Sequence, residues 1–160
     1  MKSIDLDYID LKIISELQNN GDLSNLDLAA RVGLSPSPCL RRVKLLQEAG
    51  VLKKKVTLVD AQKIGLDVSV FVQVTLERQI DENLTSFEDE IEKCPEVVEC
   101  YLMTGESDYL LRVVVPDLQA YELFLKESLT RFPSVLNIKS SFALNQVKYS
   151  TAFPLNHLRN

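Results

Sequence analysis

The chain contains 160 residues, of which 46% are hydrophobic, and its formal net charge is −5. This length is enough to bury one core or two small ones, and the absence of any run of about 18 apolar residues excludes a membrane-spanning helix. The N-terminal stretch is acidic and lacks the apolar segment of a signal peptide, so we expect a cytoplasmic protein with no membrane partner.

Three helices are predicted in the first fifty residues. The apolar residues of LDYIDLKIISELQNNG recur at a spacing of three or four, which predicts a helix over residues 6–19. A second helix begins near Asn25, because Ser24 and Asp27 have the spacing of a capping box. It ends at Gly33, where the turn needs a residue that tolerates a positive φ.

The third predicted helix starts within about three residues of that turn. Ser35 is the expected N-cap, Pro36 the first helical residue, and Pro38 lies in the first turn, where a missing N–H breaks no internal hydrogen bond. Because Pro38 has no N–H, we expect the Ser35 side chain to cap the N–H of Ser37. The predicted buried stripe consists of Leu40, Val43 and Leu46.

Two short helices joined by a tight turn are typical of a helix-turn-helix, whose second helix enters the major groove of DNA. The outward face of the third helix carries hydroxyl and cationic side chains that suit base edges and phosphates. The candidate DNA-binding residues are Ser35, Ser37, Pro38, Arg41, Arg42, Lys44, Lys53 and Lys54. The alternative is an ordinary helical hairpin whose charged face is only solvated.

The distribution of charge favours DNA binding although the net charge is negative. Residues 31–55 contain seven lysines and arginines and one acidic residue, Glu48. Residues 61–160 contain nine lysines and arginines and fifteen acidic residues. A basic N-terminal unit attached to an acidic body is expected when only one domain touches DNA.

The segment VLKKKVTLVD, residues 51–60, predicts a strand that leaves the helical unit and brings Lys53, Lys54 and Lys55 beside the DNA backbone. A solvated tether is the alternative for these lysines. A bend is expected at Gly65. We assign the DNA-binding domain to residues 1–52, a linker to residues 53–67 and a second domain to residues 68–160.

The second domain is predicted to alternate strands and helices in the order β-α-β-β-α-β. Strands are predicted over residues 68–76, 97–104 and 109–115 and within 135–149, and helices over 80–94 and 117–132. This order is that of a ferredoxin-like unit, so the fold class is α+β with a winged-type helix-turn-helix in front. We expect the helix-free face of the sheet, including the valines of its first strand, to be covered by a second copy in a homodimer.

Four segments resemble the Lrp/AsnC family of transcription regulators, and together they cover nearly the whole chain. They are LDYIDLKIISELQNNG, RVGLSPSPCLRRVKLLQEAGVL, TGESDYLLRVVVPDLQAY and SSFALNQVKYSTAFPL. The resemblance implies sequence-specific binding to double-stranded operator DNA and a C-terminal domain that senses a free amino acid. It also implies dimers that assemble further into octamers or similar discs.

The resemblance further implies an effector cleft between neighbouring sensing domains. One subunit would contribute the hairpin residues Thr104, Gly105, Glu106, Asp108 and Tyr109, and the last strand of a neighbour would contribute Asn137, Ile138, Ser140 and Ser141. Asp108 can accept a hydrogen bond from an ammonium group, and Gly105 lets backbone N–H groups approach a carboxylate. The alternative is a hairpin turn in which these two residues serve backbone geometry alone.

One departure from the family pattern bears on the effector. Many relatives have two threonines where this chain has Ile138 and Ser140. One hydroxyl is therefore missing, and we expect a more apolar cleft. This favours an effector such as leucine, methionine or cysteine over asparagine or lysine.

The sequence leaves two alternative function classes to consider. A largely non-specific, architectural DNA-wrapping protein would have the same helix-turn-helix. An enzyme is disfavoured because the chain has one histidine, His157, and neither a P-loop nor a dinucleotide fingerprint. Its three cysteines form no CxxC pair, so we expect no metal, no disulfide framework and no other cofactor.

Overall fold

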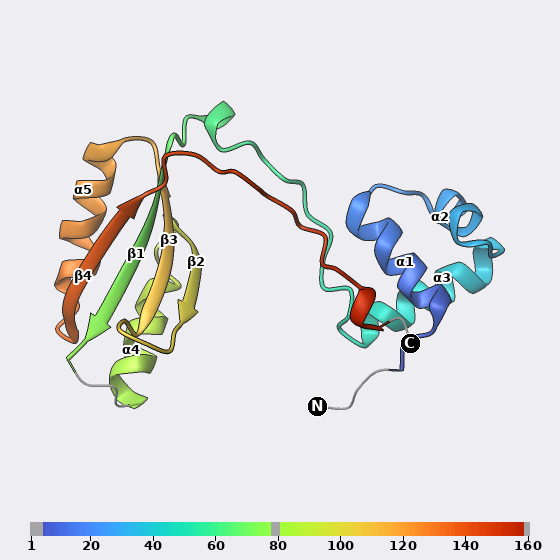
Figure 1. The fold of residues 1–160 in the computed structure, drawn as a ribbon, viewed down its shortest axis with the longest axis horizontal. Helices are drawn as coiled ribbons and strands as arrows, with labels where there is room; N and C mark the ends of the chain where they lie inside the picture. The colour runs from blue at the N-terminus through green and yellow to red at the C-terminus, as the bar shows by residue number, and fades with distance from the viewer. Residues whose placement is uncertain (1–4, 78–80, 159–160) are drawn as a thin grey trace. The chain divides into compact units, whose positions relative to one another are not determined.

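The computed structural model describes residues 5–77 and 81–158, which form two compact units (Figure 1). One unit runs to Leu58 and resumes at Lys148, and the other spans Val59–Val147. The chain therefore passes between the units twice, because its C-terminal tail groups with the N-terminal helices. This differs from the sequence-based boundaries, which assign all of residues 68–160 to the second domain.

The described part of the N-terminal unit contains the three predicted α-helices. They are α1 (Tyr8–Asn19), α2 (Asn25–Val32) and α3 (Pro36–Glu48). Helix α1 begins two residues later than predicted, because Asp7 is its N-cap. Gly33 ends α2 with a φ of +78°, as the turn prediction required.

The residues that α3 buries in the core of this unit differ from the predicted stripe. Leu40 is 44% exposed, whereas Cys39 is fully buried together with Leu46, and Val43 is partly buried. Residues 39, 43 and 46 follow the spacing of one helical face, which places Leu40 to one side of the contact. Burial also raises the pKa of the Cys39 thiol. Helices α1 and α2 contribute Ile13, Ile14, Leu28, Ala29 and Val32 to the same cluster.

The strand predicted within residues 51–60 is absent. The backbone from Lys53 to Asp60 has no strand assignment, and Val56 and Leu58 in it are exposed. A strand needs a neighbour that completes its hydrogen-bond ladder, and no strand of the described residues pairs with this segment. A short 3-10 helix, Gln62–Ile64, follows and ends at Gly65, whose φ of +78° provides the predicted bend.

The second unit has the predicted order β-α-β-β-α-β. Its elements are β1 (Val68–Leu76), α4 (Asp81–Ile91), β2 (Val97–Leu102), β3 (Tyr109–Val115), α5 (Leu118–Glu127) and β4 (Val135–Phe142). The strands form one antiparallel sheet in the order β2-β3-β1-β4, which is the ferredoxin-like arrangement. Helix α5 ends earlier than predicted, and the 3-10 helix Leu129–Arg131 follows it.

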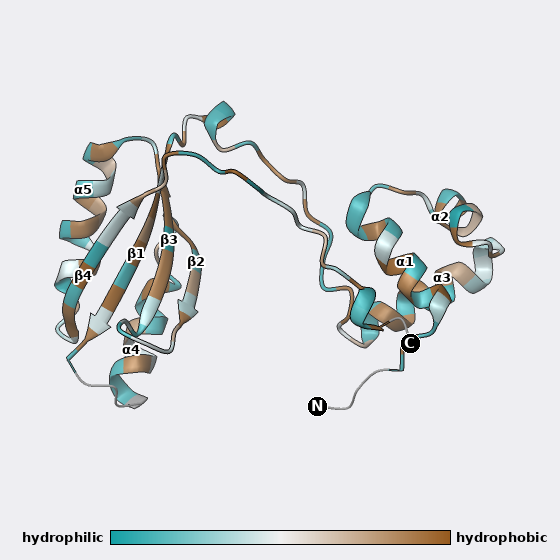
Figure 2. Ribbon diagram, viewed as in Figure 1, coloured by the Kyte–Doolittle hydropathy of each residue, from teal (hydrophilic) through white to brown (hydrophobic). Residues whose placement is uncertain are grey.

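Both helices of this unit cover the same face of the sheet. The core joins Phe87 and Ile91 of α4 and Tyr121 and Phe124 of α5 to alternate residues of β1 and β3. Figure 2 shows that hydrophobic residues follow these two central strands. The valines of β1 belong to this buried face, so the expectation that they line the helix-free face is wrong. That face instead carries Phe71 and Gln73, because side chains alternate along a strand.

Candidate functional site

Helix α3 presents an exposed face that carries hydroxyl and cationic side chains. Ser37, Arg41 and Lys44 are exposed and lie on the side of the helix opposite the buried Cys39 and Leu46. Pro38 is exposed beside Ser37. The structure thus brings four of the predicted DNA-binding residues onto one surface.

The start of α3 is held by α2 and not by its own N-cap side chain. Ser35 is the N-cap residue, but its side chain makes no capping hydrogen bond, so the predicted bond to the N–H of Ser37 is wrong. The usual partner is the N–H of the third helical residue, which here is Pro38 and has none. Instead, Asn25 at the start of α2 donates from Nδ2 to the carbonyl oxygen of Pro36 at 2.9 Å.

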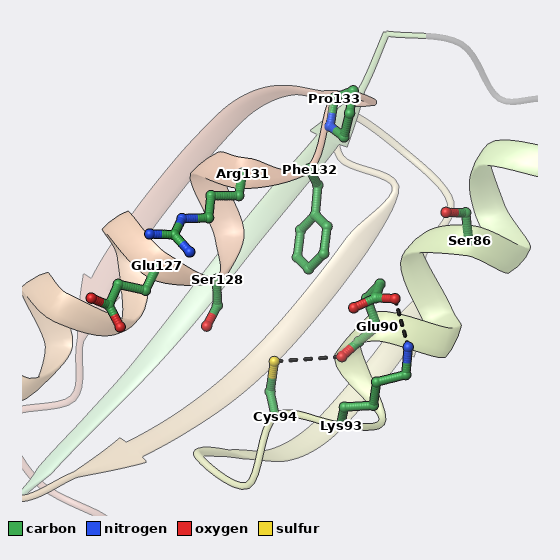
Figure 3. A pocket seen from close by; sticks show the side chains of 9 residues that line it. All are labelled: Ser86, Glu90, Lys93, Cys94, Glu127, Ser128, Arg131, Phe132 and Pro133. Atoms are coloured by element: carbon green, nitrogen blue, oxygen red, sulfur yellow. Dashed lines mark hydrogen bonds and ion pairs between the residues drawn. The ribbon is translucent and has the colours of Figure 1, made fainter.

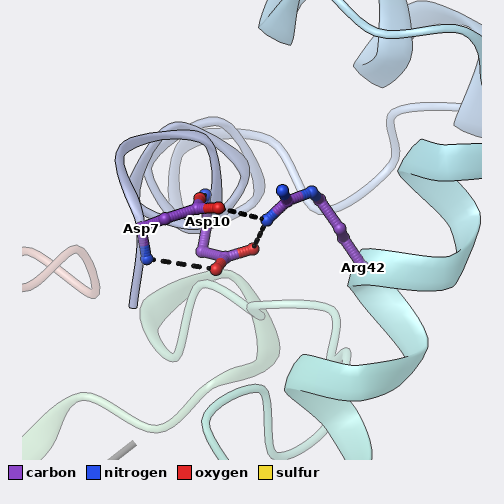
Figure 4. A network of polar contacts seen from close by, with 3 residues as sticks. All are labelled: Asp7, Asp10 and Arg42. Carbon is purple, nitrogen blue, oxygen red and sulfur yellow. Dashed lines mark hydrogen bonds and ion pairs between the residues drawn. The ribbon is translucent and has the colours of Figure 1, made fainter. Parts of the chain in front are cut away.

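Arg42 does not lie on the exposed face of α3 as predicted. Its side chain is 27% exposed and turns toward the N-terminus of α1 (Figure 4). The Nη1 atom donates to Asp7 Oδ2 at 2.7 Å and to Asp10 Oδ1 at 2.8 Å. These contacts raise the pKa of the guanidinium, chiefly through its hydrogen bond to Asp10. Lys53 and Lys54 are exposed in the extended segment after α3.

The hairpin between β2 and β3 contains the first group of predicted effector residues. Thr104, Gly105 and Glu106 are exposed, and Gly105 has a φ of +130°, which strains any other residue. Apart from Gly105 and its two chain neighbours, no atom of the described residues lies within 4 Å of the position that a Cβ on Gly105 would take. The backbone of this turn is therefore open to a small ligand.

Asp108 and Tyr109 point away from that open turn. Asp108 is only 4% exposed, and its Oδ2 accepts the backbone N–H of Leu76 at 2.6 Å. Tyr109 is 1% exposed, packs on Phe87 with ring centroids 4.6 Å apart, and donates its hydroxyl to Glu88 at 2.8 Å. Burial raises the pKa of this hydroxyl well above its ordinary value, and the Glu88 carboxylate raises it further.

The second group of predicted effector residues divides between the two faces of the sheet. Ile138 packs against the core under the helices, and Ser140 shares a hydrogen bond of 2.5 Å with the hydroxyl of Tyr121 in α5. Asn137 and Ser141 are exposed and alternate with them along β4. One face of this strand cannot present all four side chains to a single ligand.

The hairpin loop and the start of β4 lie at the same end of the sheet within one subunit. Val74 of β1 pairs with Tyr109 on one side and with Ile138 on the other. Thr75 pairs with Asn137, and its hydroxyl donates to the carbonyl oxygen of Glu106 at 3.5 Å. Sequence reasoning missed Thr75, although the alternation of β1 places it on the helix-free face with Phe71 and Gln73.

A separate hollow of about 430 Å³ lies between the ends of α4 and α5 (Figure 3). It is lined by Ser86, Glu90, Lys93, Cys94, Glu127, Ser128, Arg131, Phe132 and Pro133. Glu90 and Lys93 form an ion pair at 2.6 Å, and the Cys94 thiol donates to the Glu90 carbonyl oxygen. None of the predicted effector residues lines this hollow.

Among the described residues, no helix has the length and apolarity needed to cross a membrane. No group of three or more histidine, cysteine, aspartate or glutamate side chains there is arranged to hold a metal ion. Cys39, Cys94 and Cys100 are free thiols.

Comparison with known proteins matches each of the two units to a known domain family. Residues 6–53 match a winged helix-turn-helix DNA-binding domain, and residues 69–153 match the Lrp/AsnC ligand binding domain. The Bkd operon transcriptional regulator of Pseudomonas aeruginosa is 47% identical over 151 residues, which cover 94% of this chain and 99% of that protein. The leucine-responsive regulatory protein of Escherichia coli is 40% identical over 146 residues, which cover 91% of this chain and 89% of that protein.

The fold also matches a solved structure over nearly its full length. A transcriptional regulator from Neisseria meningitidis, solved as a complex with L-Met, has a TM-score of 0.91 and 40% sequence identity to this chain. The match covers 96% of this chain and 99% of that one.

Proposed function

Because the chain belongs to the Lrp/AsnC family of transcriptional regulators, we propose that it binds a specific operator and that a small apolar or sulfur-containing amino acid modulates its activity or assembly. The family assignment makes it a DNA-binding regulator and not an enzyme. The observation that carries the DNA part is the exposed face of α3, on which Ser37, Arg41 and Lys44 lie opposite the buried side.

In this proposal the residues of α3 divide their work by chemistry. Arg41 is long, planar and exposed, which suits a bidentate contact to guanine or to a phosphate. Lys44, Lys53 and Lys54 are point charges suited to the DNA backbone, where contacts fix register without reading sequence. Ser37, with Ser35 and Pro38 at the start of the helix, approaches the groove first.

We propose that the effector binds at the end of the sheet where the hairpin loop, Thr75 and Asn137 meet. Backbone N–H groups near Gly105 suit the carboxylate of an amino acid, and oxygen atoms of Thr75 and Asn137 suit its ammonium group. Asp108 supports the loop through Leu76, and Ile138 and Ser140 belong to the layer beneath. Ser141 and the exposed Glu106 remain candidates for contacts across a subunit interface.

An effector with an apolar or sulfur-containing side chain is supported by one observation. The Neisseria regulator with the same fold was solved with L-Met. Leucine, methionine and cysteine are therefore the first candidates.

We further propose a homodimer, assembling to an octamer or a similar disc, through the helix-free face of the sheet. Phe71 is 39% exposed on this face, and Arg112 crosses it to Glu99 at 2.9 Å. Leu110 and Val114 are partly buried beside them. A second copy would cover these apolar side chains and desolvate the ion pair.

Competition binding tests the proposal. Duplexes enriched from a random-sequence pool are labelled and competed with unselected duplex at a stated salt concentration, with and without each common amino acid. We expect selective binding that an apolar or sulfur-containing amino acid alters. Equal affinity for selected and random DNA would indicate an architectural protein, and a response limited to charged or amide side chains would refute the effector assignment.

A further inference from the structure

Arg42 follows Arg41 in α3 but contacts a different part of the molecule. Consecutive residues of a helix are turned by about 100° from one another. This rotation carries the Arg42 guanidinium away from the exposed face and to the N-terminus of α1 (Figure 4). A single nitrogen, Nη1, lies within 2.8 Å of carboxylate oxygens of both Asp7 and Asp10.

The two carboxylates are already fixed by the capping box of α1. Asp7 Oδ1 accepts the N–H of Asp10 at 2.9 Å, and Asp10 Oδ2 accepts the N–H of Asp7 at 3.2 Å. Each carboxylate therefore uses one oxygen to cap α1 and the other to hold Arg42. Because the cap orders both acidic side chains, the contact with Arg42 costs little additional side-chain entropy.

Burial distinguishes the contact between Arg42 and Asp10 from an ordinary surface ion pair. Asp10 is 15% exposed and Arg42 27%, whereas Asp7 is 53% exposed and Lys126 and Glu122 in α5 are both more than 60% exposed. Weaker solvent screening makes the contact of Arg42 with Asp10 stronger than that of an exposed pair. The contacts of Arg42 attach the middle of α3 to α1, while Asn25 attaches the start of α3 to α2.

We propose that Arg42 is a positioning residue for DNA recognition and not a DNA contact. It fixes the angle at which α3 presents Arg41 and Lys44, through the capped N-terminus of α1. This inference rests on the proposed DNA-binding function of α3. It follows that the acidic residues Asp7 and Asp10, which by charge alone oppose DNA binding, are required for it.

The two roles of Arg42 predict opposite effects when the acidic partners are removed. If Arg42 were a DNA contact, neutralising Asp10 would free the guanidinium and remove a negative charge, so affinity would rise. If Arg42 positions α3, the same change loosens the helix, and affinity falls because recognition depends on side chains held in place.

The experiment measures fluorescence anisotropy of a labelled duplex that the wild-type protein has enriched from a random pool, over a range of salt concentrations. The variants are Asp10→Asn, Asp7→Asn, Arg42→Gln and the double variant Asp10→Asn/Arg42→Gln. Asp27→Asn is the matched control, because Asp27 holds the same third position in α2 and its Oδ2 accepts from Ser24. Circular dichroism of each free variant fixes a temperature at which its helices are intact.

We expect Asp10→Asn to weaken binding roughly tenfold and Asp27→Asn to leave it equal or slightly stronger. The double variant should bind about as well as Arg42→Gln alone, because both changes break one interaction. If Asp10→Asn fails to fold, Asp7→Asn tests the positioning role instead. This variant should keep α1 capped, since asparagine is as good an N-cap as aspartate.

Unchanged or raised affinity in Asp10→Asn and Asp7→Asn would overturn the positioning role. If Arg42→Gln lowered the slope of log affinity against log salt by about 1, as the loss of one phosphate contact does, the positioning role would also be overturned. Failure of the wild-type protein to bind any duplex would instead remove the proposed function, so the two failures are distinguishable.

Discussion

Gln18 in α1 and Phe153 in the C-terminal tail are joined by two hydrogen bonds, although they are 135 positions apart in the sequence. The side-chain Oε1 of Gln18 accepts the N–H of Phe153 at 2.8 Å, and its Nε2 donates to the carbonyl oxygen of Phe153 at 3.2 Å. Leu155 packs against the core of the N-terminal unit two residues later. The tail is therefore a structural part of the helix-turn-helix unit.

Replacing Gln18 with alanine should release the tail from α1. The change removes two exposed hydrogen bonds, so we expect a loss of about 1 kcal/mol in the stability of the N-terminal unit. Hydrogen exchange should become faster at the backbone N–H of Phe153. Asn19→Ala is the control, because the Asn19 side chain donates to Ser15 within the same helix. Unchanged exchange at Phe153 would show that Leu155 alone holds the tail.

Arg41→Ala and Lys44→Ala should weaken DNA binding in different ways. If Arg41 reads a base, its loss should cost about 1–3 kcal/mol on the selected duplex and relax the sequence preference. Loss of Lys44 should weaken binding to all duplexes and lower the salt slope by about 1. Lys126→Ala in α5, an exposed lysine outside the helix-turn-helix unit, is the control for charge. Equal affinity of the Arg41 variant would remove Arg41 from the interface.

Local sequence signals predict most of the helices and strands, but they do not predict where several side chains point. The cap at Ser24, the turn at Gly33 and the alternation of Val70, Val72 and Val74 act within a few residues, and the structure has them as predicted. The orientation of Arg42 depends on α1, which lies more than thirty positions away in the sequence. No local pattern carries that information.

Local sequence patterns are also insufficient to place the side chains of the predicted effector site. The family resemblance assigns Asp108 and Tyr109 to the cleft, yet Leu76 and Phe87 determine where their side chains go. Thr75 was overlooked because its relation to Asn137 exists only after β1 and β4 pair. The distinction between the two faces of a strand was available from sequence, but which face receives the helices was not.

Asp108→Ala should destabilise the second unit. Leu76 lies at an irregularity in the pairing of β1 with β4, and its N–H donates to the buried carboxylate of Asp108. Loss of that acceptor leaves a buried N–H without its partner, which costs about 1–3 kcal/mol. Urea unfolding measures the change, and Glu106→Ala in the same hairpin is the exposed control. Equal stability of the two variants would contradict a supporting role for Asp108.

Tyr109→Phe should alter how stability depends on alkaline pH. Burial, and then the hydrogen bond to Glu88, raise the pKa of the Tyr109 hydroxyl in the folded state. A raised folded pKa stabilises the protein below the unfolded pKa of about 10, and this contribution is lost as pH rises above that value. At neutral pH the variant should be less stable by about 1 kcal/mol, because it lacks the hydrogen bond.

The difference in unfolding free energy between wild type and Tyr109→Phe should therefore shrink from about pH 10 upward. Urea unfolding at a series of pH values measures it, with the exposed Tyr149 replaced by phenylalanine as the control. Subtracting one unfolding free energy from the other cancels the contribution of lysines and other tyrosines that titrate in the same range, since both proteins contain them. A difference that stays constant through the alkaline range would mean that the hydroxyl of Tyr109 reaches solvent in the folded protein.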